Sequence, residues 1–177
     1  MLHEVVTQAD IVKAIAAAFP KEASFVPLLV LVVLGIVAVY DAVTGRVPRR
    51  IITIFFLWSV GVLAWYAGWK IALIRLGLAT AISLGLWLGN ELYVKFADRD
   101  AFGFGDVRWS ALATITYGTQ HVFVSWVVGA WLALFWLAIR WITRRIGQDG
   151  EFDMTIHFVP FLFIGLLVSL LYEAYFI

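Results

Sequence analysis

The chain has 177 residues, of which 63% are hydrophobic and 14% are charged, and its mean hydropathy is +0.95. Soluble globular domains are about half apolar and a quarter charged, so this composition excludes that class and predicts a membrane protein. The formal charge of +1 gives no basis for nucleic-acid binding, and a chain without cysteine has no disulfide, thiolate nucleophile or Cys-ligated zinc.

The first element expected along the chain is an amphipathic helix. Between residues 2 and 19, apolar side chains such as Val5, Ile11 and Phe19 recur at helical spacing, with polar Glu4 and Lys13 between them. This pattern is typical of a helix that lies in the membrane interface. We assign it to residues 1–22.

Six apolar segments follow, and we expect them to form the transmembrane core of a single membrane domain, residues 23–177. A membrane-spanning helix needs about 20 apolar residues. The expected spans are residues 25–43, 51–69, 76–94, 107–117, 122–142 and 158–175. The fourth is short, about 17 Å at 1.5 Å per residue. The predicted fold is therefore all-α and polytopic, with about six transmembrane helices plus the N-terminal amphipathic helix.

The basic residues predict the orientation in the membrane. Nine of them fall in three loops on one side, after spans one, three and five: Arg46, Arg49, Arg50, Lys95, Arg99, Arg108, Arg140, Arg144 and Arg145. The remaining four fall on the other side: Lys13, Lys21, Lys70 and Arg75. By the positive-inside rule the first group is cytoplasmic, so both termini are extracytoplasmic in a plasma (inner) membrane.

Two acids stand out because ionisable groups within a membrane mark functional sites by default. Asp41 ends the first span and Asp106 begins the fourth. These spans run in opposite directions, so both carboxylates are expected at the cytoplasmic end and could meet there. From topology alone, a pair of unrelated juxtamembrane acids remains the alternative.

The residues around these acids have both structural and functional interpretations. Gly103 and Gly105 let the backbone pass where side chains would clash, which allows a tight turn directly before Asp106. The same position also suits an Asp that only caps a helix. Pro48 suits the first turn of the second span.

The combination of motifs resembles the type IV prepilin peptidase family, which includes the archaeal preflagellin peptidases. In that family one catalytic aspartate lies in a motif of about Asp-x5-Ile-Pro-Asn and the other in Gly-x-Gly-Asp-x-Lys. Here Asp41 leads to Pro48 in an Asp-x6-Pro segment, and residues 103–108 read Gly-Phe-Gly-Asp-Val-Arg. The segment from Pro160 to Gly165 is similar to the family's Pro-Phe-Leu-x-x-Gly stretch. The resemblance covers about residues 41–165.

Two positions depart from the family pattern. Arg49 stands where the family usually has Asn, and Arg108 stands where it usually has Lys. Arg108 keeps the positive charge but not the shape of a lysine. Because neither change affects the aspartates, both bear on substrate details more than on the chemistry.

The resemblance implies an aspartic-type endopeptidase that cuts the basic leader from a prepilin-like protein substrate at the cytoplasmic face. Asp41 and Asp106 would share one proton and activate a water between them. The short fourth span would leave room for water at its cytoplasmic end. No cofactor is expected, and the scattered histidines, His3, His121 and His157, do not make a metal site. Without cysteine, cleavage without methylation is expected.

Two alternatives remain at this point. The motifs are also similar to those of presenilin and signal peptide peptidase, but those enzymes hold their aspartates deeper in the membrane and carry a Pro-Ala-Leu motif. A small proton- or cation-coupled transporter component is the non-enzyme alternative, and Glu91 in the third span would suit such a relay.

Overall fold

The chain folds into helices throughout the part that the computed structural model describes, residues 25–97, 103–146 and 156–176. In chain order the helices are α2 (Phe25–Thr44), α3 (Arg49–Ala67), α4 (Trp69–Ala97), α5 (Phe104–Tyr117), α6 (Thr119–Ile146) and α7 (Val159–Phe176). No strand occurs among these residues, so the all-α prediction is confirmed for them. The interfacial helix expected within residues 1–22 lies outside the described residues.

The helices have the length and surface of membrane helices. Four of them, α2, α3, α4 and α6, are long and apolar enough to cross a membrane. The apolar α7 is shorter, and α5 has 14 residues, or about 21 Å. Large apolar side chains such as Val32, Ile36 and Trp65 are exposed on the outside of the bundle. An exterior of this kind suits contact with lipid.

The second and third expected spans leave a connection at residues 70–75, and this prediction is wrong. A single residue, Gly68 with φ of +89°, separates α3 from α4, and Lys70 and Arg75 lie inside α4. The Arg75 side chain donates hydrogen bonds to the carbonyl oxygens of Ile115 and Thr116 at 3.2 and 3.1 Å. The Arg75 guanidinium therefore stabilises the C-terminal carbonyl groups of α5, and its charge does not mark a break in α4.

The polar break expected at residues 117–121 is also shorter than predicted. Gly118, with φ of +91°, is the only residue between α5 and α6. Its backbone N–H donates a hydrogen bond to the Thr114 carbonyl at 2.9 Å. Glycine adopts this positive φ at no steric cost, so one residue suffices for the reversal and α6 begins at Thr119.

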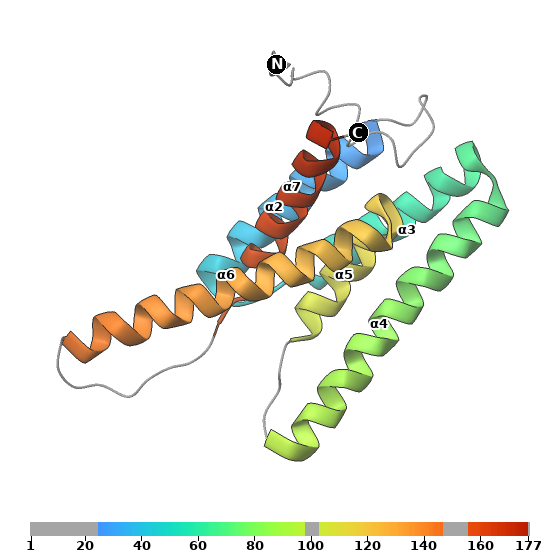
Figure 1. The fold of residues 1–177 in the computed structure, drawn as a ribbon. Helices are drawn as coiled ribbons and strands as arrows, with labels where there is room; N and C mark the ends of the chain where they lie inside the picture. Colours follow the sequence, from blue (N-terminus) through green and yellow to red (C-terminus); the bar gives the residue numbers. More distant parts are fainter. Residues whose placement is uncertain (1–24, 98–102, 147–155, 177) are drawn as a thin grey trace, which may run out of the picture.

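The short helix α5 is the centre of the bundle and contacts each of the other five helices (Figure 1). Trp109, Leu112, Ala113 and Ile115 are fully buried. A helix that is buried all round needs no amphipathic pattern, which explains why its sequence has no polar face. At its C-terminal end the Tyr117 hydroxyl donates a hydrogen bond to the Pro27 carbonyl of α2.

Two further contacts bring α6 and α7 very close together. A Cβ atom on Gly165 would lie 2.5 Å from the Ser125 carbonyl oxygen, and one on Gly129 would lie 3.1 Å from the Phe161 carbonyl carbon and oxygen. The Ser125 hydroxyl donates a hydrogen bond to the Leu162 carbonyl. Small residues thus let two membrane-type helices pack backbone against backbone.

Candidate active site

The N-terminus of α5 holds Asp106 in a fixed position. Gly103 is the residue that precedes the helix, and its backbone N–H donates a hydrogen bond to Oδ2 of Asp106 at 2.9 Å. In return the Asp106 backbone N–H donates to the Gly103 carbonyl at 3.1 Å. This reciprocal pair is a capping arrangement. The arrangement confirms the predicted helix cap. The Gly103 N–H engages Oδ2 of Asp106, and Oδ1 takes no part in this hydrogen bond.

The tight turn expected before Asp106 is the first turn of α5, closed by the hydrogen bond from the Asp106 N–H to the Gly103 carbonyl. Gly105 already lies in the first turn of α5, and Gly103 has an ordinary negative φ of −84°. The predicted need for a glycine where a side chain would clash is confirmed at Gly105, since a Cβ atom there would lie 2.5 Å from Cγ2 of Val47. The missing side chain lets the start of α5 pack against the segment that links α2 to α3.

Asp41 faces the same region from the last turn of α2. Asp41 and Asp106 are only 5% and 6% exposed, respectively. The two carboxylates are close enough for their charges to interact. The structure therefore brings together the two acids that lie 65 positions apart in the sequence.

Two groups from the start of α7 complete the surroundings of Asp41. The backbone N–H of Val159 is directed at its carboxylate, and the His157 imidazole interacts with its charge. Val159 is the first residue of α7, so its N–H has no partner within the helix and is free to stabilise a negative group. Each aspartate is thus served by the N-terminus of a helix, Asp106 by α5 and Asp41 by α7.

His157 is a site residue that the sequence interpretation missed. Its ring covers Gly45, where an added Cβ atom would lie 2.6 Å from the imidazole Cε1. Gly45 has φ of +66° and ends α2 with a hydrogen bond from its N–H to the Asp41 carbonyl at 2.8 Å. The signal that could have found His157 was its position just before the last span, at the same end as Asp41.

The remaining motif residues lie at or near the starts of α3, α5 and α7. Pro48 immediately precedes α3, and Pro160 is the second residue of α7. Both proline positions agree with the expected helix starts. The Arg108 guanidinium lies 5.9 Å from the centre of the Phe104 ring, at the outer edge of cation–π distance. Arg108 therefore contacts a side chain of its own helix.

The site combines two buried carboxylates with backbone N–H donors, and the described residues contain no cluster of three or more His, Cys, Asp or Glu able to hold a metal ion. Such a pair can hold and transfer one proton between its members. Comparisons with protein-family models, with characterised proteins and with solved structures give no match to this chain. The residues and their geometry therefore carry the functional argument.

Proposed function

We propose that this protein is a membrane-embedded aspartyl endopeptidase that removes the basic leader of a type IV prepilin-like protein. The observation that carries the proposal is the pair formed by Asp41 and Asp106, two buried carboxylates with interacting charges on separate helices. Two acids of this kind are otherwise costly to bury together within a membrane bundle. The substrate class comes from the resemblance of the surrounding motifs to the prepilin peptidases.

The reaction needs one ionised and one protonated member of the pair. The ionised carboxylate takes a proton from a water molecule held between them, and the water oxygen attacks the scissile carbonyl carbon. The protonated carboxyl donates a hydrogen bond to the carbonyl oxygen. The C–N bond then breaks, the leaving amine takes up a proton, and the pair returns to its single shared proton.

The membrane setting of the proposal has six spans, with both termini outside and the aspartates at the cytoplasmic end. Helices α4 and α6 have 29 and 28 residues, or more than 40 Å each, roughly 10 Å beyond a bilayer core. Their far ends extend past the start of α5 (Figure 1). The central helix α5 is only about 21 Å long, so its N-terminus lies deeper in the bundle than the cytoplasmic ends of α4 and α6. This depression supports the entry of water from the cytoplasm.

The alternatives are weaker on these residues. In the presenilin-like alternative the acids lie deep in the membrane, whereas exposed Arg46, Arg49 and Arg50 closely follow Asp41. In the transporter alternative Glu91 would belong to an internal relay, but its side chain is exposed on α4.

Processing of a co-expressed prepilin reporter tests the proposal. Asp41→Asn and Asp106→Asn keep the size of each side chain but cannot share a proton, so each variant should abolish leader cleavage. The exposed Glu91→Gln serves as the control for loss of an acid and should cleave at the wild-type rate. Cleavage that survives at equal membrane levels in either Asn variant would contradict the proposed mechanism.

A further inference from the structure

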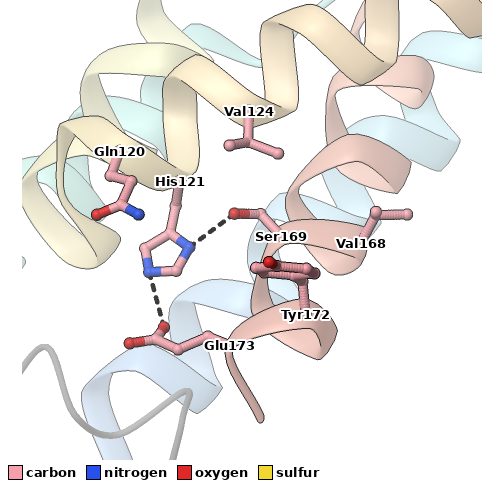
Figure 2. Close-up of a pocket in the computed structure, with 7 residues that line it drawn as sticks. All are labelled: Gln120, His121, Val124, Val168, Ser169, Tyr172 and Glu173. Carbon is pink, nitrogen blue, oxygen red and sulfur yellow. Dashed lines mark hydrogen bonds and ion pairs between the residues drawn. The ribbon is translucent and has the colours of Figure 1, made fainter. Parts of the chain in front are cut away.

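A second polar cluster lies in a cavity between the start of α6 and the end of α7 (Figure 2). The cavity has a volume of about 360 Å³, which is within the usual range for small-ligand sites. Glu173, which lines it, is 14 residues beyond Val159 along α7, or about 21 Å. The cavity is therefore separate from the aspartate pair and lies at the other end of the bundle.

The cavity results from the way α6 and α7 diverge. Their backbones are closest at Gly165 and Ser125. One helical turn further on, His121 and Ser169 span the wider gap with side chains, with 2.9 Å between the imidazole Nδ1 and the serine Oγ. Another turn brings Glu173, and here the space between the helices is open.

A chain of three polar groups forms one side of the cavity. Nε2 of His121 lies 3.0 Å from Oε2 of Glu173, and the ring joins this carboxylate to Ser169 (Figure 2). Oε2 is fully buried at this contact, so an occupant of the cavity meets the other oxygen of the Glu173 carboxylate. With a neutral imidazole the cluster carries one negative charge. The contacts of His121 with Ser169 and Glu173 join α6 to α7, but they do not fill the open volume beside them.

The other side of the cavity is apolar. Val124 and Val168 line it together with the Tyr172 ring, which is 63% exposed on the outside of α7. This exterior continues into the apolar surfaces of two membrane-type helices. An occupant therefore meets a carboxylate, which only accepts hydrogen bonds, directly beside surfaces that favour hydrocarbon.

We propose that this cavity binds a membrane phospholipid with a primary-amine headgroup. The ammonium group pairs with the Glu173 carboxylate, and the glycerol and acyl region lies along Val124, Val168 and Tyr172. The ammonium carries three hydrogen-bond donors, and because Oε2 of Glu173 faces His121, the ammonium meets the other oxygen of this carboxylate, whose side chain is 31% exposed. The position of the carboxylate near a helix end places it at headgroup depth. The proposal does not depend on the peptidase activity.

Native mass spectrometry of the purified full chain tests this site. The protein is released at pH 8 from nanodiscs of equal parts phosphatidylethanolamine and phosphatidylglycerol, two lipids that share the phosphate but differ in the amine. We expect the retained single lipid to be enriched in phosphatidylethanolamine by about fivefold, the upper range for a partly exposed ion pair. Glu173→Gln should remove the enrichment, and Glu91→Gln should keep it.

A second variant keeps the test decisive if Glu173→Gln does not fold. Val168→Trp fills the cavity without touching the polar cluster and should reduce the amount of retained lipid. Equal retention of both lipids by the wild type, unchanged enrichment in Glu173→Gln, or an unchanged amount of retained lipid in Val168→Trp would overturn the proposal. Displacement of the lipid by free ethanolamine would do so as well, because it would assign the site to soluble amines.

Discussion

Replacement of Gly105 by alanine tests whether the packing of α5 against Val47 sets the geometry of the aspartate pair. The added Cβ atom would lie 2.5 Å from Cγ2 and 2.9 Å from Cβ of Val47. Carbon atoms pack at about 3.5–4.0 Å, so the start of α5 must move by about 1 Å. Asp106 is the next residue, and a misplacement of this size costs on the order of 100-fold in rate. The overpacking itself should destabilise the fold by about 1–3 kcal/mol.

The assay is kcat/KM for leader cleavage by detergent-solubilised protein, read beside its melting temperature. Gly77→Ala is the matched control, because nothing lies within 4 Å of a Cβ atom there, and it should retain full activity. Adding Val47→Ala to Gly105→Ala removes the closest clash and should recover about tenfold of the loss. Full activity in Gly105→Ala, or no recovery in the double variant, would refute this account of Gly105.

Two further predictions address contacts around the site and the core. His157→Gln removes the imidazole beside Asp41 and should lower the cleavage rate by about fivefold, as expected for a partly exposed electrostatic contact; an unchanged rate would exclude His157 from the site. Tyr117→Phe leaves the Pro27 carbonyl without its donor and should destabilise the protein by about 1–3 kcal/mol in unfolding experiments. Tyr66→Phe, at an exposed position, is its control, and equal stability of the two variants would contradict the reasoning.

The helices and the meeting of the two acids could be predicted from the sequence because both depend on properties that run along the chain. Apolar runs of about 20 residues define the helices, and the alternating direction of successive spans places Asp41 and Asp106 at one end. The short α5 was also expected from its apolar run. Its central position was not, since a run of apolar residues does not distinguish a helix facing lipid from one surrounded by protein.

The errors fall where a residue acts through a partner that is distant in sequence. The apolar runs leave Arg75 between two expected spans, but it lies in α4 and binds carbonyl oxygens at the end of α5. The sequence predicts that a side chain at Gly105 would clash, but not that Val47 is the neighbour. His157 is one of three histidines scattered along the sequence, although the segment just before α7 brings it to Asp41. Contacts of this kind exist only once the helices have packed.

The most direct test of the central claim is a comparison of single and double variants of the aspartate pair in purified, reconstituted protein. If Asp41 and Asp106 act as one proton-sharing unit, each Asn variant removes the full catalytic effect, and the double variant is no slower than either single variant. The measured quantity is the rate of leader cleavage under single-turnover conditions. Losses that multiply in the double variant, or cleavage retained by one single variant, would contradict the claim.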